Sequence, residues 1–156
     1  MMRPFPAVAL AASLVAGAAA VHAAGDNALT AAHSEKYGAY VADVERRPLY
    51  MFTADTRGAN GKPAESDCYD ACTEAWPPLL AEDVALVGQQ LKKELVGAVE
   101  RKDGKTQITY GGWPLYYFVE DRGGKTAAGQ DVFGFGGDWY LVSPDGTTIK
   151  ENERKG

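Results

Sequence analysis

The chain has 156 residues, 46% of them hydrophobic and 24% charged, and its formal net charge at neutral pH is −5. This acidic balance, with no basic stripe that could neutralise phosphates, argues against nucleic acid as a partner. The length is that of one modest domain, which can bury roughly two thirds of the surface of its unfolded chain without many disulfides.

The first 23 residues have the build of a secretory signal peptide. Arg3 precedes an apolar run from about residue 7 to residue 20, and Val21-His-Ala23 leads to the expected cleavage site. The run is shorter than the roughly 20 residues that a spanning helix needs, so we expect cleavage after Ala23 and no membrane span. A lipid anchor would need a cysteine at the cleavage site, and none stands there. The mature protein loses one arginine, carries a formal charge of −6, and is expected to be periplasmic or secreted.

Residues 24–36 are small or polar and show no apolar period, so they predict a flexible leader before a domain that begins at Tyr37. From Tyr37 onward, apolar runs separated by turn residues predict short strands. The expected strands span residues 37–43, 48–54, 95–101, 106–110, 113–119, 139–143 and 147–150, with turns at 44–47, 103–104, 111–112 and 144–146.

Two segments break this β pattern. Ser66-Asp67 is suited to cap a short helix over residues 68–74, which ends before Pro77-Pro78. Residues 87–95 are a second helical candidate. Gly134-Phe-Gly-Gly137 precedes no helix, so we interpret it as a flexible turn with a packed phenylalanine and not as a phosphate loop. The fold class is therefore mainly β, with one or two short helices.

One phrase of eight residues occurs twice. Residues 48–55 read PLYMFTAD and residues 114–121 read PLYYFVED, so that five of the eight positions match. Similar glycine-containing loops follow both copies, and each copy then reaches a tryptophan, Trp76 or Trp139. We interpret this as an internal duplication that produces two related small antiparallel β units sharing one core, because a unit so small cannot bury its apolar face alone. The two units are expected over about residues 37–80 and 95–150, within a single domain of residues 37–156.

Several motifs occur together with the duplicated phrase. Cys68-x-x-x-Cys72 is followed by Ala75-Trp-Pro-Pro-Leu79, residues 103–116 lead into the second phrase, and Gly129-Gln130 follows it. With these motifs, roughly residues 37–146 resemble a bacterial family called the secreted repeat of unknown function, also described as predicted lipoproteins with a Tyr-x-aromatic-x-x-Asp motif. The resemblance implies an exported bacterial protein built from tandem copies. It supplies no established activity. Unlike the lipoprotein members, this chain lacks the cysteine that would carry the lipid.

The duplicated phrases and the two tryptophans supply the candidate functional residues. A structural interpretation makes the aromatic residues a shared core and makes each aspartate an acceptor for backbone N–H groups of the loop that follows it. The alternative is an aromatic cage with an acid, suited to an organic cation or a sugar. The sequence favours the structural interpretation, because duplicated structure already explains duplicated residues. The candidates are Tyr50, Phe52, Asp55, Trp76, Tyr116, Phe118, Asp121 and Trp139.

Cys68 and Cys72 are expected to pair in an oxidising compartment. A helical spacing of four residues places their Cα atoms about 6 Å apart, which a disulfide accepts. So small a loop gains little closure entropy, and its stabilisation lies at the low end of roughly 0–5 kcal/mol. A redox-active disulfide or a Cu(I) site using both thiolates remains the alternative.

Other cofactor chemistry finds little support in the sequence. The cysteine spacing does not match the motif for covalent haem attachment. A structural zinc site requires four ligands, but the mature chain offers only two cysteines and one histidine, His33. His33 is also the only candidate for a histidine base and falls in the expected leader, so we expect no catalytic residue, no metal and no cofactor.

The leading hypothesis is an exported envelope protein that acts as a non-enzymatic binding or structural module. Its partner would be an unknown envelope protein or a small ligand. The alternative hypothesis is a periplasmic redox or metal-handling protein that uses the Cys68/Cys72 pair.

Overall fold

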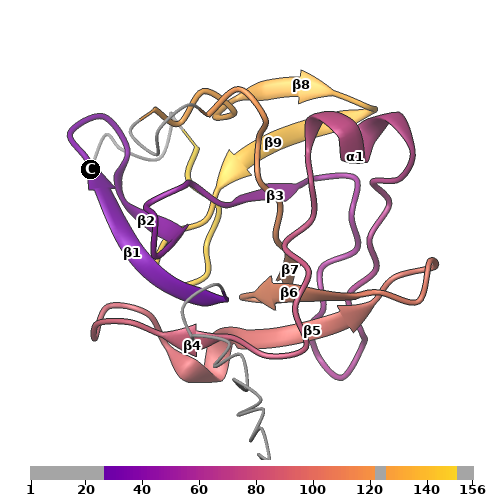
Figure 1. Ribbon diagram of the computed structural model, residues 1–156, viewed down its shortest axis with the longest axis horizontal. Coiled ribbons are helices and arrows are strands. Elements are labelled where there is room, and N and C mark those ends of the chain that lie inside the picture. The colour runs from indigo at the N-terminus through magenta and orange to yellow at the C-terminus, as the bar shows by residue number, and fades with distance from the viewer. Residues whose placement is uncertain (1–26, 122–125, 151–156) are drawn as a thin grey trace, which may run out of the picture.

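The computed structural model describes residues 27–121 and 126–150 (Figure 1). The predicted signal peptide lies outside these residues. The described part is mainly β, as predicted, with one α-helix of five residues and one single-turn 3-10 helix. The strands are β1 (Ala28–Ser34), β2 (Gly38–Asp43), β3 (Tyr50–Phe52), β4 (Ala85–Leu86), β5 (Val96–Glu100), β6 (Thr106–Tyr110), β7 (Trp113–Pro114), β8 (Val132–Gly134) and β9 (Gly137–Leu141), and the helices are α1 (Ala71–Ala75) and η1 (Lys93–Leu95).

The strands form three small sheets. Their orders are β2-β1-β4, β3-β9-β8 and β5-β6-β7, and the neighbours are antiparallel except for β1 and β4. In Figure 1, β5 and β6 lie on the opposite side of the molecule from β8, β9 and α1, and β3 runs between them. The sheet that contains β3 combines strands from both halves of the chain, since β3 belongs to the first phrase and β9 follows the second.

The register of two hairpins shows the duplication directly. In β1–β2, Leu29 faces Asp43, and in β5–β6, Val96 faces Tyr110, which are residues 67 positions later in both strands. The eight-residue phrases recur at an offset of 66. The connection between the hairpin and the phrase is therefore one residue shorter in the second half.

The predicted flexible leader is wrong for residues 28–34, which form β1. This strand pairs with β2 over six positions and buries Ala28, Leu29 and Ala32. Its sequence, ALTAAHS, is rich in alanine, which has low β propensity, so tertiary pairing and not local preference makes it a strand. Because β1 is the counterpart of β5, the first unit begins before Tyr37.

The two halves meet at the duplicated tyrosines. The Tyr50 N–H donates to the Tyr116 carbonyl at 2.8 Å, and the Tyr116 N–H donates to the Tyr50 carbonyl at 3.0 Å. On one side of this pair β3 pairs with β9, and on the other side the chain after α1 pairs with the second phrase, where the Leu79 N–H donates to the Leu115 carbonyl at 2.9 Å. The expected strand over residues 113–119 shortens to β7 because Pro77-Pro78 on its partner segment lacks N–H donors.

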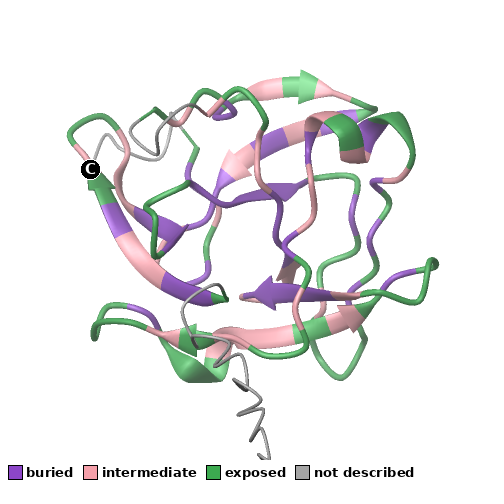
Figure 2. Ribbon diagram, viewed as in Figure 1, coloured by how far each residue is buried: buried purple, intermediate pink, exposed green. Residues whose placement is uncertain are grey.

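The phrase strands are buried on both faces, as alternation predicts. Figure 2 shows the β3 strand buried along its length. Tyr50 and Phe52 belong to one apolar cluster, whereas Leu49 and Met51 belong to a second cluster on the opposite face. The core is therefore two layers of side chains divided by the strands that the duplication supplied.

Three local predictions need correction. The first helix begins at Ala71 and not near Cys68, because the Ser66 hydroxyl lies against the Tyr116 hydroxyl and does not cap it. The expected return strand over residues 147–150 is reduced to one bridge, between Val142 and Thr148. The turn at 134–137 forms, but its phenylalanine, Phe135, is 52% exposed and therefore not packed.

Candidate functional site

The duplicated tyrosines and aspartates bind each other across the two units. The Tyr50 hydroxyl donates to Asp121 Oδ2 at 2.6 Å, and the Tyr116 hydroxyl donates to Asp55 Oδ2 at 2.8 Å. Each tyrosine thus uses the aspartate of the other unit. The sequence analysis missed this exchange of partners. The matching tyrosine and aspartate of the two phrases were the signal that could have indicated it.

Each aspartate also holds the loop that follows its phrase. Asp55 Oδ1 accepts the Asp67 N–H at 2.8 Å, and Asp121 Oδ1 accepts the Ala128 N–H at 2.8 Å. The two loops differ in length, since these acceptor and donor residues are 12 and 7 positions apart. The carboxylates therefore link the backbone at Asp67 and at Ala128 to the contact between units.

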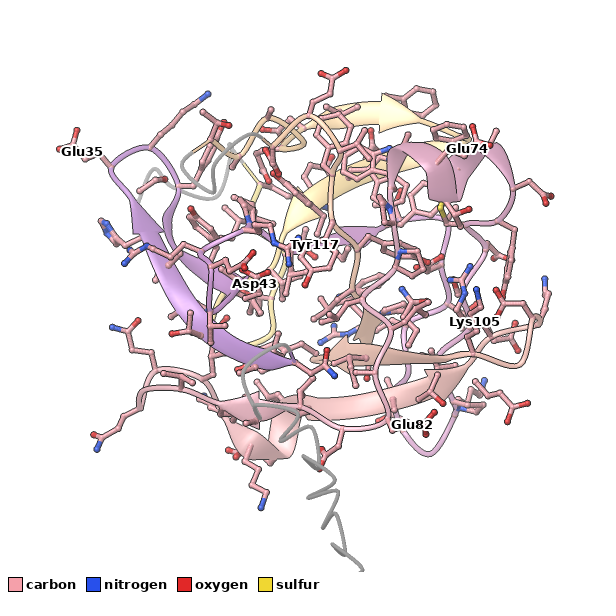
Figure 3. All side chains as sticks on the ribbon, viewed as in Figure 1. Glu35, Asp43, Glu74, Glu82, Lys105 and Tyr117 are labelled. Carbon is pink, nitrogen blue, oxygen red and sulfur yellow. A yellow bond between two sulfur atoms is a disulfide. The ribbon has the colours of Figure 1, made fainter. Side chains whose placement is uncertain are left out.

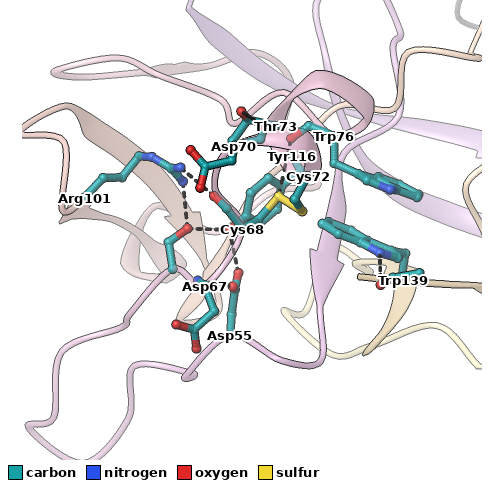
Figure 4. The surroundings of a disulfide bond; sticks show 12 residues. Asp55, Asp67, Cys68, Asp70, Cys72, Thr73, Trp76, Arg101, Tyr116 and Trp139 are labelled. Carbon is teal, nitrogen blue, oxygen red and sulfur yellow. Dashed lines mark hydrogen bonds between the residues drawn. A yellow bond between two sulfur atoms is a disulfide. The ribbon is translucent and has the colours of Figure 1, made fainter. Parts of the chain in front are cut away.

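The other aromatic candidates stack in one column. The ring centroids are 4.0 Å apart between Phe52 and Trp139, 3.9 Å between Trp139 and Trp76, and 4.1 Å between Trp76 and Phe118. Figure 4 shows the two indoles lying face to face. Because each indole is covered on both faces by another ring, the tryptophans have no free face with which to surround a cation.

Gly129 allows this column to form. A Cβ atom at Gly129 would lie 2.7 Å from Cη2 of Trp76 and 2.9 Å from Cζ of Tyr50, closer than real Cβ contacts allow. The Gly129 N–H also donates to the Tyr50 hydroxyl at 3.2 Å. The glycine of the Gly129-Gln130 motif therefore has a packing role.

A polar network surrounds Asp55 (Figure 4), and two of its members, Ser66 and Arg101, line a separate cleft of about 280 Å³ that Asp55 does not reach. The Tyr116 hydroxyl that bonds to Asp55 lies 2.5 Å from the Ser66 hydroxyl, which in turn accepts a hydrogen bond from Arg101 Nη1 at 2.7 Å. The same Nη1 donates to Gln107 Oε1 at 2.7 Å. Asp55 is 6% exposed and Arg101 only 3%, so this carboxylate has no open side at which a ligand could reach it.

The electrostatics of this network depend on burial. Burial raises the pKa of the Asp55 carboxyl to about 7, although the Asp67 N–H, the Tyr116 hydroxyl and the Arg101 charge lower it in part. Replacing water by protein disfavours the charged carboxylate, and the hydrogen bonds recover only part of this cost. Asp55 thus changes its protonation near neutral pH while remaining in the core.

We expect the Asp55 carboxyl to lower the stability of the protein as the pH rises from about 4 to about 7. Its pKa is about 7 in the folded state and about 3.9 in an unfolded chain, so between these values the folded state binds a proton that the unfolded state has released. The contribution to the free energy of unfolding is greatest at the acidic end and decreases by on the order of 3 kcal/mol. Urea unfolding at several pH values measures it.

The control for this prediction is Asp55→Asn, which does not titrate. Asp103 and Asp145 have lowered pKa values, through the Lys105 N–H and the Ser143 hydroxyl respectively, and act in the opposite direction. The informative quantity is therefore the difference between wild type and Asp55→Asn. If the free energy of unfolding of the wild type does not fall relative to that of Asp55→Asn between pH 4 and pH 7, the prediction is contradicted.

The surroundings of Asp121 are open. Burial raises the pKa of this carboxyl too, against the lowering effects of the Tyr50 hydroxyl and the Ala128 N–H. Asp121 nevertheless reaches a cleft of about 250 Å³. The cleft is lined by Arg47, Pro48, Pro77, Tyr117, Phe118, Val119 and Asp121.

Arg47 is held at the rim of this cleft. Its Nε donates to Asp43 Oδ2 at 2.7 Å and lies 3.3 Å from Glu45, while the guanidinium carbon stands 4.5 Å from the centroid of the Tyr117 ring. The Tyr117 hydroxyl donates to the same Asp43 oxygen at 3.3 Å, and Figure 3 shows these two residues side by side. Asp43 therefore orients both the arginine and the tyrosine that line the cleft.

The cysteines form the predicted disulfide. Cys68 and Cys72 are bonded, with their Cα atoms 5.3 Å apart, and their side chains pack in the same cluster as Trp76. Cys68 is fully buried and Cys72 is 5% exposed. An attacking thiolate therefore has no open path to Cys68, and neither sulfur is a thiolate that could bind a metal.

The structure also locates the remaining candidates. His33 is exposed on β1. No group of three or more histidine, cysteine, aspartate or glutamate side chains in residues 27–121 and 126–150 is placed to hold a metal ion. No helix within the same ranges is long and apolar enough to cross a membrane.

The sequence analysis missed Arg47 and Tyr117, which line the cleft. It also missed Arg101, which belongs to the hydrogen-bond network around Asp55. A charged residue at the end of a strand is normally solvated, so Arg101 carried no signal of burial. For Arg47 a weak signal existed, namely the spacing of four residues from Asp43 across a predicted turn.

Comparison with known proteins identifies the family of this chain. The family described as secreted repeat of unknown function matches residues 31–80 and 97–143. Each matched segment contains one tyrosine–aspartate phrase, and the first begins inside β1. No curated protein and no solved structure matches the chain. Because two separate copies of the family pattern match and together cover more than half of the sequence, the chain belongs to the family of secreted repeats of unknown function.

Proposed function

We propose that this protein is an exported, non-enzymatic binding module and that its ligand site is the cleft beside Asp121. One observation supports the proposal above all others: the two duplicated tyrosine–aspartate pairs have unequal surroundings. Asp55 is enclosed by the network that includes Arg101, whereas Asp121 reaches an open cleft. The packing role of the pairs needs both to be buried, and it gives no reason for one of them to border a cleft.

The chemistry of the cleft supports binding more than catalysis. Its lining contains one carboxylate, and the described residues that form it include no histidine, cysteine, serine or lysine. Both oxygens of Asp121 already accept a hydrogen bond. A carboxylate held in this way is suited to orient a ligand and lacks the partner acid, base or nucleophile that a reaction would require.

Chemical-shift mapping by NMR tests the proposal. The mature protein is titrated with small amines, sugars and amino acids, each at millimolar concentration. We expect at least one class of probe to shift the amide signals of residues 117–121, and Asp121→Asn to reduce that affinity at least tenfold. Glu120→Gln removes an equal charge from an exposed neighbour and serves as the matched control. If no probe shifts these signals, or if both variants weaken binding equally, the cleft is not a ligand site.

The double variant Cys68→Ser/Cys72→Ser separates this proposal from a redox or metal-handling function. Closing a loop of four residues is worth about 2 kcal/mol in the chain-entropy model, so we expect a loss of that size in the free energy of unfolding. We also expect unchanged binding at the cleft, because neither cysteine lines it. Retained stability, together with the loss of a thiol-exchange or copper-binding activity that the wild type possesses, would favour the redox or metal-handling function.

A further inference from the structure

The cleft beside Asp121 carries information about the class of its ligand, and the inference that follows rests on the proposed binding function. We infer that the cleft takes a small zwitterion of the amino-acid type, with a carboxylate at Arg47, an ammonium group at Asp121 and an apolar side chain against the remaining walls of the cleft. The two charged ends and the apolar walls each contribute to this assignment.

Arg47 presents hydrogen-bond donors that the described residues leave unused. A guanidinium has five N–H groups, and only the one on Nε bonds to Asp43. The four on the terminal nitrogens make no hydrogen bond within residues 27–121 and 126–150, although the guanidinium as a whole pairs with Asp43 and Glu45, and the side chain is 46% exposed. Its position over the Tyr117 ring restrains the plane of the guanidinium. A planar, restrained fork of this kind matches a carboxylate.

Asp121 presents the opposite charge with acceptors to spare. A carboxylate has about four lone-pair positions, of which the Tyr50 hydroxyl and the Ala128 N–H occupy two. None of the salt bridges formed within the described ranges includes Asp121. An ammonium group would therefore supply both the donors and the positive charge that this carboxylate lacks.

Much of the remaining wall of the cleft is apolar. Pro48, Pro77, Phe118 and Val119 contribute side chains without hydrogen-bonding groups, and the volume of about 250 Å³ equals the share of about eight liquid water molecules. This size suits a single small molecule. A purely anionic ligand would face Asp121, and a purely cationic one would face Arg47, so each would lose at one end what it gained at the other.

Isothermal titration calorimetry with two matched sets of probes tests the inference on the mature protein. The first set is L-phenylalanine, phenethylamine and 3-phenylpropionate, and the second is L-leucine, 3-methylbutylamine and 4-methylpentanoate. Within a set the apolar body is constant and only the charged groups change. In at least one set we expect the amino acid to bind at least tenfold more tightly than the amine and the carboxylate.

Variants assign the two ends. Asp121→Asn should weaken the amino acid to the level of the carboxylate probe, and Arg47→Gln should weaken it to the level of the amine probe. Arg57→Gln is the control, because Arg57 also stands over an aromatic ring, that of Trp113, but does not line the cleft. Thermal melting of each variant confirms that it is folded.

The outcomes distinguish the inference from the proposed function. An amine that binds as tightly as the amino acid, or a carboxylate that does so, overturns the zwitterion inference while the binding function stands. Failure of all six probes to bind also overturns it, and the wider NMR titration then decides the binding function separately. Binding of the amino acid that survives both Asp121→Asn and Arg47→Gln would place it elsewhere on the protein and contradict the inference.

Discussion

Replacing Asp55 by alanine is expected to lower the free energy of unfolding by about 3 kcal/mol, because it removes the acceptor of a buried hydroxyl and of a partly buried backbone N–H. The Tyr116 hydroxyl would lose its partner in the core, where water cannot replace it, and the Asp67 N–H would lose its partner at the edge of the core. Asp121→Ala is expected to cost about 1 kcal/mol, since its carboxyl borders an open cleft and water can take over its hydrogen bonds. Urea unfolding at pH 6 measures both variants.

The comparison between the two aspartates is the decisive part of this prediction. Asp55→Asn is the conservative control, because its amide oxygen still accepts the Asp67 N–H, and it should lose less than Asp55→Ala. Equal losses at the two positions would mean that the closed and open surroundings do not differ in energy. An unchanged free energy of unfolding for Asp55→Ala, accompanied by lost ligand binding, would show that the role of this carboxyl is functional and not structural.

The second large effect is expected from Trp139→Ala, at about 4 kcal/mol. Trp139 is fully buried and stacks on Phe52 and Trp76, with the Tyr116 ring edge-on at 5.2 Å. Its removal would leave a cavity in the middle of the column and break contacts to both units. Guanidinium unfolding gives the change in stability, and near-ultraviolet circular dichroism reports the loss of the stacked indole pair.

Phe133→Ala supplies the matched control for the tryptophan. Phe133 lies on the adjacent strand β8 and is 72% exposed, so its truncation should change the free energy of unfolding by less than about 0.5 kcal/mol. Trp139→Phe retains an aromatic ring and should fall between the two. A loss for Trp139→Ala no greater than that for Phe133→Ala would mean that the column does not hold the units together.

These two predictions share a structural basis, which is that neither unit completes its own core. Tyr50 needs Asp121, Tyr116 needs Asp55, and each tryptophan stacks on a phenylalanine of the other half. The duplicated halves therefore stabilise each other, and damage to one is felt in both. The interior also holds a buried arginine, Arg101, and two buried carboxyls, those of Asp43 and Asp55.

The sequence by itself determined the features that depend on local pattern. Alternation along residues 48–54 predicted a strand buried on both faces, turn residues placed most hairpins, and a spacing of four residues with an oxidising compartment predicted the Cys68–Cys72 disulfide. The five matching positions of the two phrases and their similar flanking loops predicted the duplication. Each of these signals lies within a few residues or in a direct comparison of two segments, so no knowledge of distant contacts was needed.

Only the tertiary structure decided which units exchange partners and where the molecule is open. The bonds from Tyr50 to Asp121 and from Tyr116 to Asp55 join residues 71 and 61 positions apart, and no local period encodes them. β1 was missed for the same reason, because its pairing with β2 overrides the weak β propensity of alanine. The burial of Arg101 closes one aspartate while the other borders a cleft, a difference that two nearly equal phrases cannot express. It arises because residues from outside each phrase complete the surroundings of its carboxyl, namely Ser66 and Arg101 at Asp55, and Arg47, Pro48 and Pro77 at Asp121.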